Sequence, residues 1–118
     1  MPSAHPRAEL LATPDWLAAN LARHDLRVLD VRWRPDGSAR LLWAAGHLPG
    51  AVYLDWANEL VGGTDDAGVL RLAAPDLVAD AIAAAGVGDH HEVVVYDDSA
   101  SLFAARVWWS LRVAGHAR

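Results

Sequence analysis

An apolar strand pattern, a short polar loop and an amphipathic helix pattern follow one another near the end of the chain. Residues 93–96 form the apolar run, residues 97–101 form the polar loop, and the helix pattern ends at Gly115. An uninterrupted apolar run is typical of a parallel strand that is buried on both faces. Ligands of open parallel sheets bind beyond the carboxyl ends of the strands, where the next helix presents free N–H groups. The loop that begins at Asp97 is therefore the first candidate for a functional site.

Length and composition limit the chemistry that this chain can perform. The sequence has 118 residues, of which 53% are hydrophobic, and this size favours one domain with a single core over residues 1–118. The sequence contains no Cys, which excludes disulfides, thiolate metal sites and a cysteine nucleophile within it. All ten basic residues are Arg, so a lysine Schiff base and a P-loop lysine are excluded as well.

The charge balance and the hydropathy pattern bear on partners and location. Fifteen acidic residues against ten Arg give a net charge of −5, which disfavours binding to a nucleic-acid backbone. No uncharged apolar run approaches the roughly 18 residues of a membrane span. The first seven residues lack the apolar segment of a secretion signal. We therefore expect a cytoplasmic protein that binds neither nucleic acid nor membrane.

Strand and helix patterns alternate along the chain. The expected strands are residues 9–12, 27–31, 51–54 and 93–96. The expected helices are residues 14–23, 40–45, 75–85 and 102–114, the first capped by Thr13 with proline at its first position. Residues 60–72 hold glycines and paired Asp65 and Asp66, which indicates a loop or a short hairpin. This order predicts an α/β domain with an open, mainly parallel sheet and helices on both faces.

The end of the chain is unusual for such a domain. The last expected helix ends at Gly115, and only three residues follow. A helix that leaves a buried parallel strand normally returns to another strand of the same sheet. We therefore expect the domain to be incomplete at its C-terminus, truncated before its last strand.

Four short segments of the chain match sequence patterns of one known family. They are residues 28–33 (Val-Leu-Asp-Val-Arg-Trp), 46–52 (Gly-His-Leu-Pro-Gly-Ala-Val), 93–97 (Val-Val-Val-Tyr-Asp) and 105–116, which holds Ala-Arg-Val-Trp-Trp before Gly-His. Together they resemble the rhodanese family, and more closely the first domain of tandem-domain thiosulfate or 3-mercaptopyruvate sulfurtransferases. The resemblance extends from about Leu11 to His116 and implies a rhodanese-like fold.

The resemblance also implies a function. Enzymes of this kind have a second domain with a reactive Cys, which takes sulfur from thiosulfate or 3-mercaptopyruvate as a persulfide and passes it to cyanide or a thiol. The matching position here is Asp97, whose carboxylate is not a sulfur nucleophile. We therefore expect the non-nucleophilic N-terminal domain of a sulfurtransferase, inactive alone. Its expected partners are a C-terminal catalytic rhodanese domain and a small sulfur-containing anion, with no cofactor and no metal.

Two more residues are candidates for a supporting role. In mercaptopyruvate enzymes, the histidine that matches His47 and an upstream aspartate have been proposed to form a relay with a serine of the second domain. Asp36 is the candidate for that aspartate here.

The loop after Asp97 contains no glycine, so its backbone is expected to avoid the positive φ angles of a tight anion cradle.

Other interpretations remain open at this point. The chain could be a stand-alone, non-catalytic rhodanese-like module that binds a partner or an anion. A hydrolase that uses Asp36 with His47, or Asp97 with a histidine, needs a geometry that spacing does not establish.

Several side chains have structural interpretations beside the functional ones. Because neighbouring residues at the start of a strand point to opposite faces, His90 and His91 are expected in a solvated loop and not at a metal. Trp108 is expected in the core, and Trp109 in the core or at a domain interface. Arg106 is expected in an ion pair at a surface or an interface.

Overall fold

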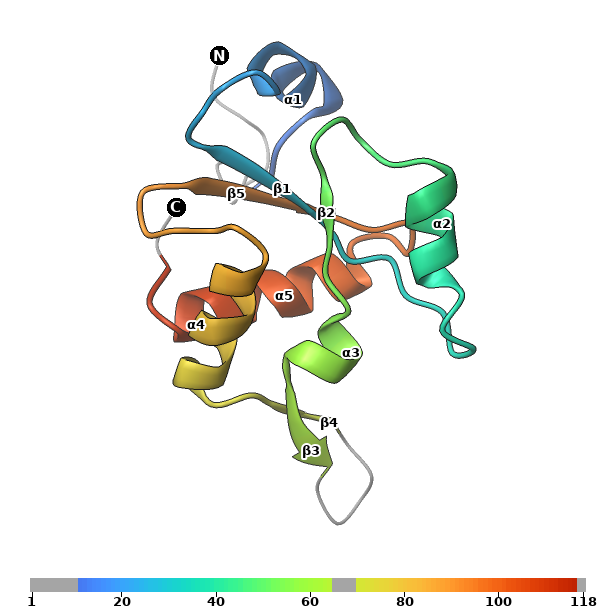
Figure 1. Ribbon diagram of the computed structural model, residues 1–118, viewed down its shortest axis with the longest axis vertical. Helices are drawn as coiled ribbons and strands as arrows, with labels where there is room; N and C mark the ends of the chain where they lie inside the picture. Colours follow the sequence, from blue (N-terminus) through green and yellow to red (C-terminus); the bar gives the residue numbers. More distant parts are fainter. Residues whose placement is uncertain (1–10, 65–69, 117–118) are drawn as a thin grey trace.

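A sheet of three parallel strands forms the centre of the molecule (Figure 1). The structure is a computed structural model, and it describes residues 11–64 and 70–116. The strand order is β2-β1-β5, where β2 is Val52–Tyr53, β1 is Leu26–Asp30 and β5 is Glu92–Tyr96. β1 pairs with β5 along its whole length and with β2 at its carboxyl end. The expected open parallel sheet is confirmed.

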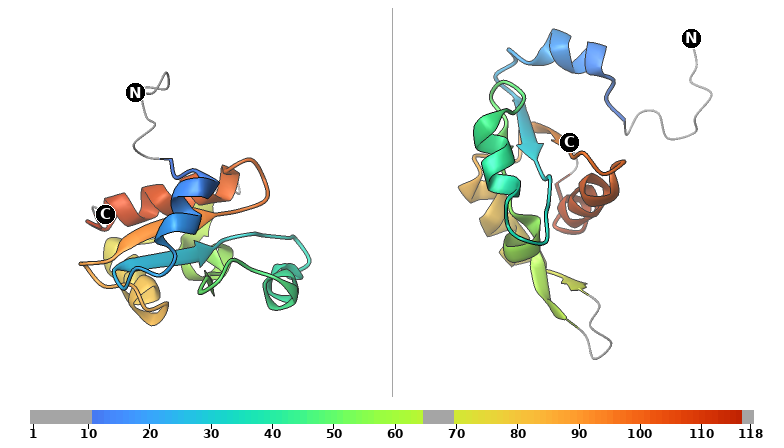
Figure 2. Two further views of the ribbon diagram at one scale, coloured as in Figure 1. Left: turned by 90° about the horizontal axis from the view of Figure 1, so that it is seen from above. Right: turned by 90° about the vertical axis from the view of Figure 1, so that its right-hand side faces the viewer.

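Five helices and a hairpin make up the rest of the described chain. The helices are α1 (Pro14–Asn20), α2 (Ala39–Ala45), α3 (Trp56–Glu59), α4 (Pro75–Ala84) and α5 (Leu102–Val113). The strands β3 (Val61–Thr64) and β4 (Leu70–Leu72) pair antiparallel, which agrees with the hairpin, one of the two expectations for this region. The hairpin extends away from the sheet, as Figure 1 and the right view of Figure 2 show, and Asp65 and Asp66 lie outside the described residues.

Apolar side chains pack on both faces of the sheet, because alternate residues of a strand point to opposite sides. The larger cluster joins β1 to α3, α4 and α5, and its buried members are Leu29, Val31, Leu54, Trp56, Leu60, Ala73, Val78, Ile82, Val87, Ala104, Val107 and Leu111. The smaller cluster consists of Leu26, Val28 and Ala51, with Leu17 and Leu21 from the α1 region packed against it. The site loops lie at the carboxyl ends of strands that are held by these two clusters.

The helix α1 begins where the sequence predicts and ends earlier. The Thr13 hydroxyl accepts a hydrogen bond from the Trp16 N–H at 3.1 Å, which is the expected N-cap. The helix ends at Asn20, three residues before the predicted end, because Arg23 binds the Asp25 carboxylate in the turn that follows. The strand expected over residues 9–12 is not formed at 11 and 12, and its first two residues lie outside the described part.

Of the two adjacent tryptophans of α5, Trp108 differs from expectation, and Trp109 is not in the core. Val107 and Leu111 occupy the core positions, while Trp108 is only half-buried and Trp109 is 52% exposed. The guanidinium of Arg112 lies 5.2 Å from the centre of the Trp108 ring, a cation–π contact at the surface. The prediction of Trp108 as a core residue was therefore wrong, because the helical period places its neighbours on the buried face.

The length and hydropathy of the described helices show whether any of them could span a membrane. None of the helices within residues 11–64 and 70–116 combines the length and the apolar character that crossing a bilayer requires. The cytoplasmic location stays a prediction.

Candidate functional site

The carboxylate of Asp97 organises the loop between β5 and α5. Its Oδ1 accepts hydrogen bonds from the backbone N–H groups of Ser99 at 3.0 Å and Ser101 at 2.9 Å. Its Oδ2 accepts from the N–H groups of Phe103 and Ala104, both at 2.8 Å. One side chain therefore closes the loop and caps the first turn of α5.

This arrangement keeps the Asp97 carboxylate ionised. Burial acts to raise the pKa of Asp97, but the backbone N–H groups outweigh it and hold the pKa below its ordinary value. The carboxylate thus occupies, from within the chain, the place where a loop of this type would bind an external anion. Chemically it is an acceptor and a cap.

The backbone of the loop adopts a conformation that the sequence did not predict. Ala100 has φ of 56° and Ser101 has φ of 67°, both in the left-handed region. Such angles cost a non-glycine residue on the order of 1 kcal/mol each. The expectation that the missing glycine prevents positive φ was wrong, because the hydrogen bonds from Ser99 and Ser101 to Asp97 hold the loop in this shape.

An ion pair joins this loop to the loop that follows β1. Both terminal nitrogens of Arg34 donate to the carboxylate of Asp98, and Arg34 also donates to the carbonyl of Trp33 at 2.8 Å. The hydrogen bonds from Arg34 hold the pKa of Asp98 below its ordinary value. Sequence analysis missed this pair because its members are 64 residues apart and neither belongs to a recognisable motif.

A buried carboxylate lies beneath the same edge of the sheet. Asp30 is fully buried and accepts hydrogen bonds from Arg32, including one of 2.7 Å from Nη2, and from the Tyr96 hydroxyl at 2.9 Å. Arg32 Nη2 also donates to the Gly46 carbonyl at 2.8 Å, and the Tyr96 hydroxyl accepts from the Leu48 N–H at 3.2 Å. This network attaches the turn that carries His47 to the ends of β1 and β5.

The structure shows the surroundings of His47. Its Nδ1 lies 2.7 Å from the carbonyl of Trp43, so Nδ1 is the donor, and its ring stacks on the Trp43 ring with 4.3 Å between centres. This leaves Nε2 of the neutral ring as an acceptor.

Asp36, the other candidate, is occupied within its own turn. Asp36 accepts from the Ser38 N–H at 3.0 Å, and hydrogen bonds from Ser38 lower the pKa of Asp36. Asp36 and His47 both belong to the part of the chain that the structure describes, and no hydrogen bond or ion pair joins them there. Their relay with a second domain stays a prediction. Nor does a described histidine bond to Asp97, so the geometry adds no support to a hydrolase.

The two adjacent histidines lie before β5 and not within it. His91 is 6% exposed, its Nδ1 accepts from the Gly88 N–H at 2.7 Å, and its ring centre is 3.9 Å from that of His90. His116 donates from Nε2 to the His91 carbonyl at 2.9 Å. The expectation of a solvated loop with the rings on opposite faces was wrong for His91, because the pair is in a turn where strand alternation does not apply.

An aromatic cluster lies next to the Asp97 loop. Trp33, Trp56 and Phe103 are in mutual contact, with ring centres 5.2–5.8 Å apart. The guanidinium of Arg106 lies 5.3 Å from the centre of the Trp56 ring. The cluster packs the start of α5 against the loop that follows β1 and against α3.

Within the described part of the chain, no group of three or more His, Asp or Glu side chains is arranged to hold a metal ion.

These features define a class of protein. It is an α/β domain with a parallel sheet, in which the loop at the carboxyl end of β5 directs its backbone N–H groups at the carboxylate of Asp97. The family model for the rhodanese-like domain matches residues 13–118. The chain belongs to the rhodanese-like domain family, and its resemblance to the sulfurtransferases of that family is confirmed.

Two curated relatives show how similar the chain is to named sulfurtransferases and how much of their length it covers. It is 37% identical to thiosulfate/3-mercaptopyruvate sulfurtransferase 1, a mitochondrial protein of Arabidopsis thaliana, covering 92% of this chain and 29% of the relative. It is 32% identical to the thiosulfate sulfurtransferase of Corynebacterium glutamicum, covering 96% of this chain and 34% of the relative. The chain thus spans about a third of the length of these curated relatives.

A solved structure has the same fold. The crystal structure of SseA from Escherichia coli, described as a 3-mercaptopyruvate sulfotransferase with the rhodanese fold, superposes with a TM-score of 0.68 at 30% identity. The match covers 83% of this chain and 38% of that one.

Proposed function

We propose that this chain is the N-terminal, non-nucleophilic rhodanese domain of a sulfurtransferase. In this proposal a second rhodanese domain carries the reactive Cys. That Cys takes sulfane sulfur from thiosulfate or 3-mercaptopyruvate and transfers it to a thiol or cyanide through a persulfide. The present domain supports and lines the site, with His47 and Asp36 as candidate supporting residues.

One observation carries the proposal. Four backbone N–H groups bind the carboxylate of Asp97, the residue that the family resemblance matches to the reactive Cys. A carboxylate that already binds these donors leaves them unavailable to a persulfide anion at this loop. The names of the relatives and the share of their length that the chain covers support the assignment to one domain of a longer enzyme.

The direct test is thiocyanate formation by the purified 118-residue chain. With thiosulfate and cyanide as substrates, we expect no thiocyanate above the rate of the buffer alone, because the chain has no thiol to carry the sulfur. A two-domain thiosulfate sulfurtransferase serves as the positive control. Measurable turnover by this chain would overturn the proposal that the chemistry lies in another domain.

The second candidate is a stand-alone rhodanese-like module that binds a partner without catalysis. The self-contained Asp97 loop favours it, since the chain satisfies its own N–H donors there. Both candidates predict inactivity, so thermal unfolding distinguishes them. A cooperative melt of a monomer favours the stand-alone module, whereas an aggregated or molten product favours a domain that needs its catalytic partner.

A further inference from the structure

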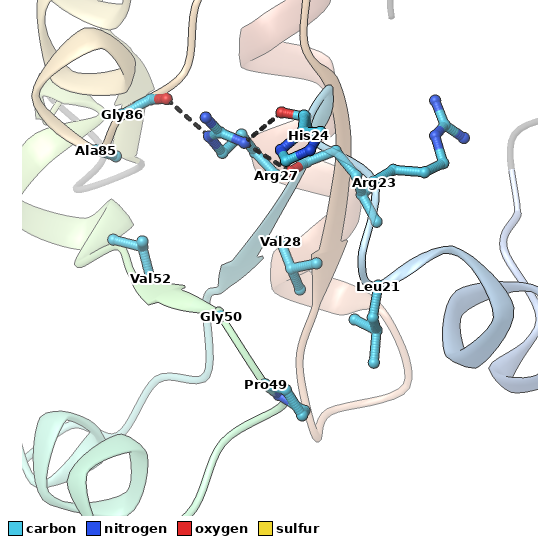
Figure 3. A pocket seen from close by; sticks show the side chains of 11 residues that line it. Leu21, Arg23, His24, Arg27, Val28, Pro49, Gly50, Val52, Ala85 and Gly86 are labelled. Atoms are coloured by element: carbon cyan, nitrogen blue, oxygen red, sulfur yellow. Dashed lines mark hydrogen bonds between the residues drawn. The ribbon is translucent and has the colours of Figure 1, made fainter.

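A hollow lies at the opposite end of the sheet from the Asp97 loop. It has a volume of about 470 Å³ and lies at the amino ends of β1 and β2, between the turn after α1 and the end of α4 (Figure 3). This volume is within the range of sites that bind small molecules. Its apolar lining includes Leu21, Val28, Pro49 and Val52.

The guanidinium of Arg27 is held in a fixed position at this hollow. Its Nε donates to the Gly86 carbonyl at 3.1 Å, and its Nη1 donates to the carbonyls of His24 and Leu26, both at 2.9 Å (Figure 3). These three acceptors are neutral. Among the described residues, Arg27 pairs with no carboxylate, and its Nη2 has no hydrogen-bond partner.

The acidic side chains near the hollow pair with another arginine and not with Arg27. No acidic side chain is among the described residues that line it, although the whole chain has a net charge of −5. The second arginine of the lining, Arg23, forms ion pairs with two carboxylates, Asp25 at 2.8 Å and Glu92 at 3.0 Å. In Figure 3 its guanidinium points away from Val52. The hollow therefore holds one positioned guanidinium that makes no ion pair with a described residue, beside apolar side chains.

We propose that this hollow is a binding site for a small organic carboxylate with a short apolar body. The carboxylate accepts an end-on hydrogen bond from Arg27 Nη2, and the apolar body packs against Val52 and Pro49. A preorganised guanidinium loses little entropy when it binds an anion, which favours this contact over one with a mobile surface arginine. The site is separate from the sulfur chemistry proposed above and does not depend on it.

The test titrates the full 118-residue chain with butyrate and follows backbone amide signals by NMR. We expect saturable shifts at Arg27, Gly86 and Val52. Butylammonium has the same apolar body with the opposite charge and should give none of these shifts. Inorganic phosphate has charge but no apolar body and should bind at least tenfold more weakly. Equal binding of phosphate and butyrate would overturn the proposed ligand class.

Three variants locate the site. Arg27→Gln should abolish the saturable shifts, and Arg112→Gln, at an exposed position on α5, should leave them unchanged. His24→Glu leaves Arg27 in place and adds a negative charge to the wall, so it should weaken butyrate binding at least tenfold even if Arg27→Gln fails to fold. Absence of saturable shifts in the unmodified chain, or equal binding by His24→Glu, would overturn the proposal.

Discussion

The hydroxyl of Tyr96 donates a hydrogen bond to the buried carboxylate of Asp30, with 2.9 Å between Oη and Oδ2. The same hydroxyl accepts from the Leu48 N–H. Tyr96→Phe therefore removes one donor from a buried carboxylate and one acceptor from a backbone N–H. We expect this variant to lower the free energy of unfolding by about 1–3 kcal/mol, measured by urea denaturation.

Tyr53→Phe is the matched control for this variant. The Tyr53 ring lies under the guanidinium of Arg40, at 4.9 Å, and its hydroxyl has no hydrogen-bond partner among the described residues. Because phenylalanine keeps the ring contact, we expect a change below about 0.5 kcal/mol. Equal losses in the two variants would show that the bond to Asp30 does not contribute as argued.

Local signals explain what the sequence could predict. Thr13 and Pro14 mark the start of α1, and the apolar runs mark β1 and β5, because capping and strand patterns depend on neighbouring residues. The sequence predicts a capping role for Asp97, and its hydrogen bonds agree with that role, whereas its match to the family's nucleophile position stays a prediction.

Contacts between distant residues explain what the sequence could not predict. The Arg34–Asp98 pair and the Tyr96–Asp30 bond join residues 64 and 66 positions apart, and no local pattern encodes them. The left-handed angle of Ala100 arises from the hydrogen bonds to Asp97 and not from its own preference. The features that shape the site most therefore depend on the folded sheet.

Removal of the Asp97 carboxylate should destabilise the loop and the start of α5. Asp97→Ala leaves four backbone N–H groups without their acceptor, and we expect a loss of about 2 kcal/mol in the free energy of unfolding. Asp97→Asn should lose part of this stability, because its carbonyl oxygen can still accept from two of the N–H groups while its NH2 group faces the other two donors. Asp80→Ala, at an exposed position on α4, is the control and should change stability by less than about 0.5 kcal/mol.

The pH dependence of the Asp97 contribution follows from its lowered pKa. A carboxylate with a lower pKa in the folded state than its ordinary 3.8 stabilises the fold fully above that value and loses the contribution as pH falls through the folded pKa. Stability curves of the unmodified chain and of Asp97→Asn should therefore converge below pH 3.8. A constant difference across the acid range would contradict this account.

His91 should make stability depend on pH in the mildly acidic range. Burial, and then the positive charge of Arg27, hold the pKa of His91 below its ordinary 6.5, and its Nδ1 accepts the Gly88 N–H only when unprotonated. The other groups that act on it are Asp25, His90 and His116. Its contribution is therefore fully present above pH 6.5 and is lost as pH falls through the lower, folded pKa.

Unfolding at a series of pH values tests this dependence. His91→Asn offers an amide oxygen that can accept the same N–H and does not titrate, so its stability should fall less between pH 7 and pH 5 than that of the unmodified chain. The control His24→Asn changes an exposed histidine and should keep the original dependence. Identical pH profiles in the two variants would assign the dependence to other groups.

Hydrogen exchange should distinguish the two edges of β5. The Glu92 N–H donates to the Asp25 carbonyl at 2.7 Å, and the Tyr96 carbonyl accepts from the Val31 N–H at 3.0 Å, so alternate residues of β5 bond towards β1. By the same alternation, the N–H groups of the intervening residues 93 and 95 point to the other edge. Within residues 11–64 and 70–116, no strand pairs with that edge.

We therefore expect the amides of Val93 and Val95 to exchange at least about tenfold faster than the amide of Val94, because an unpaired strand edge is open to water. The measurement is amide exchange by NMR in the 118-residue chain at low concentration. In a longer chain that adds a strand at this edge, the same two amides should become as protected as Val94. Equal protection of the three amides in the 118-residue chain, independent of concentration, would contradict an open edge at β5.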